Sequence, residues 1–306
     1  MFPCLLMWLS MGATSIAPWL VPVIASAASD LYVDSASGDD TNPGTRDQPL
    51  LTIGRALRLA PVGDVVIKLN RGTFSEATGE RFPLVIAAGR QIVGHGEGLS
   101  TILGSESDPV VVELLPGDEN LSGCLKGVTV SGGKTGVRVK GPKISWTLKD
   151  FQITDSDIGL DAKHAAQGLL ELEDVHWLSN RTGLQLAAEN SLQVTIRKCR
   201  FESQSVAGLL GTEGALATDD SPNGNTAPIA LVENSLFVGN DVGIHLPRPT
   251  GDHPITVRSC EFNENVHYGI RAAGANGDPS KTAFIEDSTF RRNGIGIYLT
   301  LSLIHI

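Results

Sequence analysis

A segment that recurs about every 24 residues constrains the fold of this chain more than any other feature. Each copy has a large apolar residue, in most copies a polar amide three positions later, and then a glycine. Successive glycines lie 23, 24, 25, 35, 26 and 27 residues apart, so one copy carries an insertion. The large apolar residues are Val130, Ile153, Trp177, Phe201, Phe237, Phe262 and Phe290, and the glycines are Gly136, Gly159, Gly183, Gly208, Gly243, Gly269 and Gly296. A period of this length predicts a solenoid, in which each coil packs on the one before it.

The sequence within one repeat predicts strands rather than helices. Apolar and polar residues alternate before the large apolar residue and again after the glycine, which leaves room for three short strands in each coil. No stretch of about ten residues with a helical period remains, which argues against a leucine-rich repeat. We therefore predict an all-β fold, a right-handed single-stranded parallel β-helix of about ten coils. Thr52 is expected to begin a short helix, from Ile53 to Ala60, that caps the N-terminal end.

Three columns of the repeat are predicted to be structural. Amides stacked at an inside turn would bond one another and the neighbouring backbone, and the glycines after them would supply a φ that other residues resist. The amides are Asn180, Gln204, Asn240, Asn265 and Asn293, and the glycines given this role include Gly183, Gly243, Gly269 and Gly296. A third column alternates in charge through Glu173, Arg197, Glu233, Arg258 and Glu286, and it is expected to fix the register of the strands.

The composition divides the chain into four segments. Residues 1–27 carry no charged side chain and end with Ala25-Ser26-Ala27, which predicts a secretory signal peptide, although the usual positive residues at its start are missing. Residues 28–120 are expected to form an N-terminal cap and irregular first coils, and residues 121–300 the regular coils. Residues 301–306 are what a transposase-end oligonucleotide of sequencing libraries encodes in one frame, so we expect a non-native tail on a fragment.

Export and net charge narrow the range of partners. A cleaved signal peptide predicts a protein that is secreted or on the cell surface of a bacterium, with no transmembrane helix after cleavage. We expect the protein to be a monomer. The 34 acidic and 24 basic residues give a formal charge of −10, which repels nucleic acid.

Cleavage of the signal peptide would leave three cysteines, Cys124, Cys199 and Cys260. The last two share a repeat column with one coil between them, too far apart for a disulfide, and are expected to be buried.

The N-terminal block carries a more specific pattern than the repeats. Its motifs are Tyr32-Val33-Asp34, Gly38-Asp39-Asp40, Asn42-Pro43-Gly44-Thr45, Pro49, Thr52-Ile53, Ala56-Leu57, Ala60, Gly63-Asp64, Gly72-Thr73-Phe74 and Glu80-Arg81-Phe82-Pro83-Leu84-Val85-Ile86. Over residues 31–104 the chain resembles a bacterial family, domain of unknown function 1565, within the pectin-lyase-like β-helix superfamily. The resemblance implies an exported protein that works on or near polysaccharide, and it transfers no catalytic residue.

One edge of the later coils is predicted to bind ligand. Long loops at residues 212–229, 247–254 and 273–282 emerge there, and solenoids place insertions on their binding face. The outward column two residues after each glycine reads Arg138, Asp161, Gln185, Leu210, His245, Arg271 and Tyr298. The last three, with the loop residues Asp252 and His253, would bind the hydroxyls and the carboxylate of a uronate sugar.

A catalytic form of this site would need a cation and a base. Asp219 and Asp220 would ligate Ca²⁺, the only cofactor that the sequence indicates, and Arg271 or Lys281 would act as the base of a polysaccharide lyase. Ordinary loop composition accounts for the same residues.

Other acidic and histidine residues are assigned to turns and surface. Asp155, Asp157 and Asp161 form one acidic set, and Asp34, Asp39 and Asp40 another; both are expected to be turn residues, with metal binding as the alternative. The histidines His95, His164, His176 and His267 show no partner spacing and are expected on the surface or in turns.

Three functions remain open at this stage. The leading hypothesis is a secreted or cell-surface β-helix that binds or associates with polysaccharide without demonstrated catalysis. One alternative is a polysaccharide lyase or hydrolase similar to pectate lyases, which would release unsaturated or reducing sugar products. Another is a surface adhesin or structural spacer, which would carry attached modules.

Overall fold

The structure is a computed structural model of the chain. It describes residues 30–61, 63, 65–118, 121–187, 191–212, 230–247, 255–274 and 283–301. The predicted signal peptide and residues 302–306 of the predicted tail lie outside the described residues.

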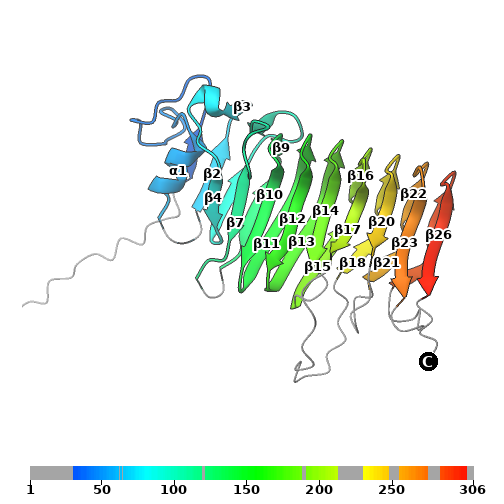
Figure 1. Cartoon of the computed structure of the whole chain (residues 1–306). Helices are drawn as coiled ribbons and strands as arrows, with labels where there is room; N and C mark the ends of the chain where they lie inside the picture. The colour runs from blue at the N-terminus through cyan, green and yellow to red at the C-terminus, as the bar shows by residue number, and fades with distance from the viewer. Residues whose placement is uncertain are drawn as a thin grey trace, which may run out of the picture.

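The strands stack side by side along one axis and form an elongated solenoid (Figure 1). One face is a nine-stranded parallel sheet. Its strands are β4 (Leu84–Ala87), β7 (Val112–Leu115), β10 (Thr135–Gly141), β12 (Ile158–Ala165), β14 (Thr182–Ala187), β17 (Ala207–Thr212), β20 (Val242–Leu246), β23 (Tyr268–Gly274) and β26 (Ile295–Leu301). About eight full turns of chain separate the first of these strands from the last, fewer than the ten or so coils expected from the sequence.

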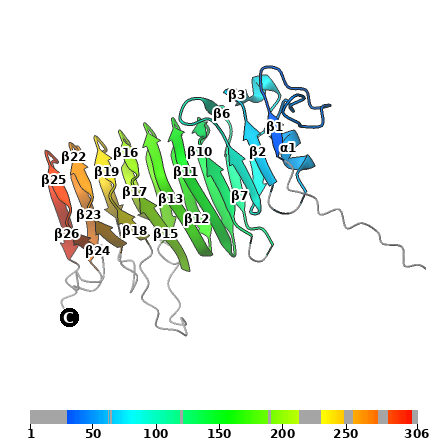
Figure 2. The same ribbon diagram turned by 180° about the vertical axis from the view of Figure 1, so that it is seen from behind.

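The other two faces belong to a 17-stranded sheet that bends between them. The first of these faces contains β1 (Leu31–Val33), β2 (Val65–Leu69), β5 (Arg90–Val93), β8 (Gly123–Lys126), β11 (Ile144–Thr154), β13 (Gln167–Leu178), β15 (Ser191–Arg197), β18 (Ala230–Glu233), β21 (Ile255–Arg258) and β24 (Ala283–Glu286). The second contains β3 (Gly72–Ser75), β6 (Ser100–Leu103), β9 (Thr129–Ser131), β16 (Arg200–Glu202), β19 (Leu236–Val238), β22 (Glu261–Asn263) and β25 (Thr289–Arg291), visible from behind in Figure 2. Strands β11 and β13 run through the bend and pair on both faces. The three strands per coil confirm the predicted parallel β-helix.

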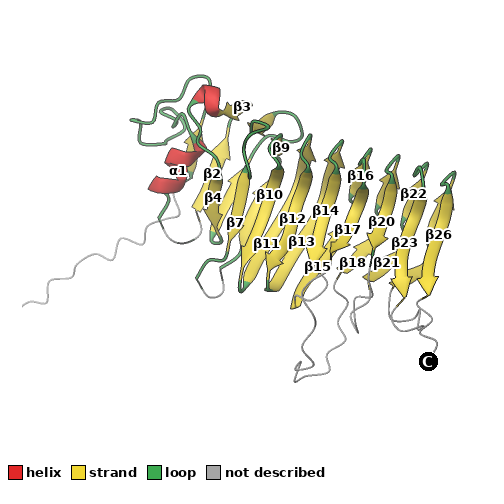
Figure 3. Ribbon diagram, in the orientation of Figure 1, coloured by secondary structure: helices red, strands yellow, loops and turns green. Residues whose placement is uncertain are grey.

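The helices lie at the N-terminal end, and strands make up the rest of the regular structure (Figure 3). The predicted capping helix is α1 (Ile53–Leu59), and the Thr52 side chain accepts a hydrogen bond from the Arg55 N–H at 3.0 Å. Ile53 and Ala56 are fully buried against the first coils, so α1 covers the end of the core. A single 3-10 turn, η1 (Glu76–Thr78), follows β3.

Asp34 and Asp39 are turn residues, as the sequence predicts, whereas Asp40 Oδ1 accepts from the Leu51 and Thr52 N–H groups, 11 and 12 residues later, at 3.1 and 2.9 Å. Asp34 Oδ1 accepts from the Ala36 N–H at 2.9 Å, and Asp39 Oδ1 accepts from the Thr41 N–H at 2.8 Å. Partial burial acts to raise the pKa of Asp34. Hydrogen bonds from Ser37, Asn70 and Ala36 outweigh it and lower the pKa of this carboxyl to about 2. These carboxylates fix the loop before α1 by hydrogen bonds.

The core contains a continuous ladder of stacked rings in the predicted apolar column. The neighbouring ring centroids of Trp177, Phe201, Phe237, Phe262 and Phe290 are 4.3 to 4.8 Å apart, and their planes are within 7° of parallel. Strand pairing places each ring directly above the next, because the coils repeat at the spacing of paired strands. The ladder confirms the column read from the sequence.

The amide column also forms the predicted ladder. The side-chain oxygen of Asn240 accepts from the backbone N–H of Gln204 at 3.0 Å, and its amide nitrogen donates to the Phe201 carbonyl at 2.9 Å. Asn265 repeats both bonds one coil later, with the Asn240 N–H at 3.1 Å and the Phe237 carbonyl at 3.0 Å. The buried amides therefore bond the backbone at the second bend of each coil.

The prediction that the repeated glycines supply an unusual φ is wrong. None of the seven, from Gly136 to Gly296, is among the described residues with positive φ. Instead, a Cβ at Gly208 would lie 2.7 Å from the Gly243 carbonyl oxygen and 2.9 Å from Phe237 Cδ1. Glycine is needed there because the next coil and the aromatic ring leave no space for a side chain.

Residues in the left-handed region occur at two other columns. One lies three residues before the large apolar residue, as in Ser259 (φ 53°), and marks the predicted first bend. The other lies two residues after it, as in Glu264 (φ 56°), one position before the amide. The second bend is therefore centred before the amide rather than at it.

The charge column forms the predicted ion pairs from Arg197 to Glu286 on the first face, whereas Glu173 pairs with Lys149 and Lys198. Arg258 contacts Glu233 at 3.2 Å on one side and Glu286 at 2.8 Å on the other.

In the described part of the chain Cys124, Cys199 and Cys260 are free thiols, and burial raises the pKa of Cys199 to about 12. Cys199 and Cys260 are both buried, as the sequence predicts.

Candidate functional site

The outward column that the sequence assigns to ligand binding forms one straight row on the nine-stranded sheet. Strand pairing places Arg138 beside Asp161, Asp161 beside Gln185, and Gln185 beside Leu210. It continues with Leu210 beside His245, His245 beside Arg271, and Arg271 beside Tyr298. The three candidate residues of the last coils therefore lie on adjacent strands, β20, β23 and β26.

Aromatic and cationic groups meet at the end of this row. Arg271 Cζ lies 5.5 Å from the ring centroid of Tyr268 on the same strand. The rings of Tyr268 and Tyr298 are 5.3 Å apart and inclined at 42°. Burial, followed by the positive charge of Arg271, lowers the pKa of His245 below its usual value of 6.5. At neutral pH this end of the row therefore presents a neutral imidazole, a guanidinium and two phenols.

The loop residues assigned to the site cannot be placed beside the row. Asp219, Asp220, Asp252, His253 and Lys281 lie outside the described residues. The Ca²⁺ ligands and the lysine base remain predictions. Among the residues that the structure describes, no group of three or more His, Cys, Asp or Glu side chains is arranged to hold a metal ion.

The acidic set of Asp155, Asp157 and Asp161 does not come together as a metal site. Asp155 occupies the bend column with φ 56°, as a turn residue does. Asp161 is instead buried in the outward row, and its Oδ2 lies 3.6 Å from both Arg138 Nε and His164 Nε2. Sequence reasoning missed this cluster of Arg138, Asp161 and His164.

Three of the histidines that show no partner spacing in the sequence have acidic neighbours in the structure. His164 approaches Asp161, His176 Nε2 lies 3.2 Å from Glu202 Oε2, and His267 Nδ1 contacts Asp241 Oδ1. The last two contacts join residues in adjacent coils, 26 positions apart in the sequence. His164 and His267 are exposed, as the sequence predicts. Their acidic partners could not be read from spacing along the chain, because the solenoid brings residues one period apart into contact.

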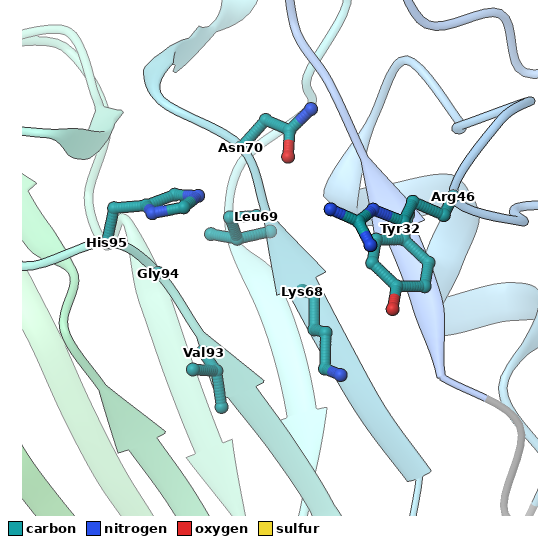
Figure 4. A pocket seen from close by; sticks show the side chains of 8 residues that line it. All are labelled: Tyr32, Arg46, Lys68, Leu69, Asn70, Val93, Gly94 and His95. Carbon is teal, nitrogen blue, oxygen red and sulfur yellow. The ribbon is translucent and has the colours of Figure 1, made fainter.

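A pocket of about 520 Å³ lies at the N-terminal end, away from the row (Figure 4). It is lined by Tyr32, Arg46, Lys68, Leu69, Asn70, Val93, Gly94 and His95. Lys68 pairs with Asp30 and lies over the Tyr32 ring, and Asn70 donates to Asp34 at 3.0 Å. Since protein groups already engage Lys68 and Asn70, the row on the nine-stranded sheet is the better candidate for a binding site.

Helices that could span a membrane are absent from the part of the chain that the structure describes.

Comparison of the fold with solved structures finds the crystal structure of the pectate lyase Pel9A, with a TM-score of 0.59 and 14% identity, covering 89% of this chain and 77% of that one. ORF18 of Geobacillus virus E2 matches with a TM-score of 0.50 and 12% identity over 90% of this chain and 62% of its own. At these identities the likeness shows the fold alone. No curated protein matches the sequence.

The sequence matches two family models, one over the N-terminal block and one over the regular repeats. Residues 36–167 match the family described as "Protein of unknown function (DUF1565)", which confirms the resemblance of the N-terminal block. Residues 120–303 match the family described as "Right handed beta helix region". This second match covers more than half of the chain and all of its described regular coils from β8 onward. The chain belongs to the right-handed beta helix family.

Proposed function

We propose that this protein binds polysaccharide along the outward row of the nine-stranded sheet, with His245, Arg271 and Tyr298 as the principal contacts. The observation that carries the proposal is their alignment on adjacent strands. Paired strands are about 4.8 Å apart, so the row presents hydrogen-bonding side chains at a regular spacing along the solenoid. A linear polymer lying on the row would contact several coils at once, as extended ligands of solenoid proteins do.

The chemistry of the three side chains suits a sugar polymer. Tyr298 has 40% of its surface exposed, so its ring can pack against the apolar face of a sugar while its hydroxyl meets solvent or ligand. Arg271 offers planar guanidinium donors that match a carboxylate or a pair of hydroxyls. His245, kept neutral by its lowered pKa, has one donor and one acceptor for hydroxyls.

Two further observations support the proposal. The fold similarity to a pectate lyase agrees with a polysaccharide ligand. The signal peptide predicted at residues 1–27 agrees with a location outside the cytoplasm, where such polymers occur. We therefore place the protein in the secreted or cell-surface class, as a binding protein.

Affinity gel electrophoresis of the whole chain tests this function. Native gels would contain polygalacturonate, alginate, a glycosaminoglycan or a neutral glucan, and we expect at least one polymer to retard the protein. Arg271→Ala and Tyr298→Ala should each lower the affinity about threefold to tenfold, the loss of roughly 1 kcal/mol of contact. The matched control is Arg291→Ala, an exposed arginine of β25 on another face, which should migrate like the wild type. Migration unaffected by every polymer would rule out the proposal.

A further inference from the structure

A compact charged cluster lies on the same outward face, three coils before the row of His245, Arg271 and Tyr298. Arg138 and Lys140 come from β10, and Asp161 and His164 come from the adjacent β12, whose positions appear in Figure 1. Strand pairing sets Arg138 beside Asp161 and Lys140 beside His164. The pairing of the coils does not need a charge at this position, because the residue that pairs with Asp161 one coil later is Gln185.

A β-bulge creates the cluster. The register between β10 and β12 shifts by one residue between Arg138 and Lys140, so β12 carries one residue more than its partner. Residues three apart on a regular strand point to opposite faces, but here Ala162 and Ala165 are both buried while His164 is exposed. The extra residue turns His164 to the outward face, where its Nε2 comes within 3.6 Å of Asp161 Oδ2.

The two cations of the cluster, Arg138 and Lys140, reach solvent, whereas its carboxylate is covered. The Asp161 side chain is 1% exposed, whereas those of Arg138, His164 and Lys140 are 27%, 48% and 58% exposed. The only other acid paired with the cluster in the described chain is Glu113, 17% exposed, whose Oε1 lies 3.9 Å from Lys140 Nζ. A molecule approaching from solvent therefore meets cations first, on a protein whose formal charge is −10.

Some polar atoms in and beside the cluster have no hydrogen-bond partner. Asp161 Oδ1 accepts from the Lys163 N–H at 3.2 Å, but its contacts with the Arg138 and His164 side chains are 3.6 Å, longer than a hydrogen bond. Within the described residues, Arg138 Nε and Gln185 Oε1 are buried atoms with no hydrogen-bond partner. A carboxylate from solvent would accept charge-assisted hydrogen bonds from the other guanidinium nitrogens of Arg138, while the buried Nε stays beside Asp161.

We propose that Arg138, Lys140 and His164 form a site for the carboxylate of a uronic acid unit, with Asp161 as the residue that holds Arg138 and His164 in place. The inference rests on the proposed function and names its substrate class, an acidic polysaccharide. The same outward row joins the cluster to His245 and Arg271, so one polymer chain can contact both. The bulge sets this coil apart from the other coils that the structure describes.

Binding of the whole protein to polygalacturonate and to its fully methyl-esterified form separates charge recognition from sugar recognition. The two polymers share one backbone and differ in their carboxylates. We expect polygalacturonate to bind about tenfold more tightly. Lys140→Gln should reduce that preference about threefold, and Arg138→Gln about tenfold, the scale of one exposed and one partly buried charge contact.

Two controls keep the result interpretable. Lys126→Gln removes a charge from another face, where Lys126 is 49% exposed and pairs with Asp150 at 3.8 Å, and should keep the full preference. Lys140 is more than half exposed, so its substitution leaves the fold intact if Arg138→Gln disturbs it.

The outcomes distinguish this inference from the proposed function. A carboxylate preference that Lys140→Gln lowers and Lys126→Gln leaves unchanged supports the site. Equal binding of both polymers, or a preference that Lys140→Gln and Arg138→Gln do not change, overturns the site while the proposed function stands. Binding of neither of these polymers, nor of those in the electrophoresis, overturns both.

Discussion

Arg271 lies directly beside His245 on the neighbouring strand of the nine-stranded sheet. Burial of the imidazole, with the positive charge of Arg271 as the second cause, lowers the pKa of His245. The pair therefore keeps one cation and one neutral hydrogen-bonding group next to each other at neutral pH.

The Arg271→Gln variant tests this coupling. Removal of the guanidinium charge should raise the pKa of His245, but the value should stay below 6.5 because burial, the larger cause, remains. An NMR titration of the imidazole proton resonances measures both values. The coupling is absent if the His245 titration is the same in the variant and in the wild type.

Asn240→Ala should destabilise the solenoid by about 3 kcal/mol, because it leaves the Gln204 N–H and the Phe201 carbonyl without their partner in a buried position. Arg258→Ala, which removes two exposed ion pairs of the charge column, should cost less than about 1 kcal/mol. Urea unfolding followed by circular dichroism compares the two variants. Equal losses would mean that the amide ladder is no more important than the surface charges.

Gly208→Ala should destabilise the protein by more than about 2 kcal/mol, because its Cβ would lie 2.7 Å from the Gly243 carbonyl oxygen. Gly239→Ala is the matched control. Gly239 has φ 63°, but its Cβ would have only Ser203 Oγ nearby, at 3.8 Å, and Glu264 already occupies the same column with φ 56°. A cost of about 1 kcal/mol or less is expected for this control. Thermal midpoints in the reverse order would show that backbone φ, rather than close packing, selects the repeated glycines.

Asp34 should contribute to acid denaturation. Its folded pKa of about 2 is below the usual 3.8, so the folded state binds the proton less readily than the unfolded chain. The stabilisation is therefore present above about pH 4 and is lost as the pH falls toward 2. With allowance for solvent screening it amounts to roughly 1 kcal/mol.

The Asp34→Asn variant provides the measurement. Urea midpoints should differ between variant and wild type at pH 6 and converge near pH 2, because the other carboxylates are common to both proteins. A difference that stays constant over this range would assign the role of Asp34 to its hydrogen bonds alone.

The fold was predictable because one coil determines the environment of the next. Phe237 and Phe262 occur at the same repeat position, so their stacking follows from the period alone. The glycine column was identified correctly, but its cause was not, since the close approach of Gly243 to Gly208 depends on how neighbouring coils pack. The sequence shows which repeat position is glycine, and the packing of neighbouring coils explains why it is glycine.

The cluster around Asp161 was not predictable to the same degree. A regular strand would point His164 inward, and only the bulge brings it to Asp161. The change in apolar spacing from two to three residues, at Leu160, Ala162 and Ala165, is the signal that could have revealed the bulge. Bulges are deviations from the period, so an argument from periodicity passes over them.

Calorimetric titration of the whole protein with oligogalacturonides of increasing length tests the central claim most directly. If the ligand lies along the row of His245, Arg271 and Tyr298, affinity should rise from disaccharide to octasaccharide as more coils are contacted. The Arg271→Ala and Tyr298→Ala double variant should lose that rise. Equal affinity for the disaccharide and the octasaccharide, or a rise that the double variant retains, would contradict binding along the row.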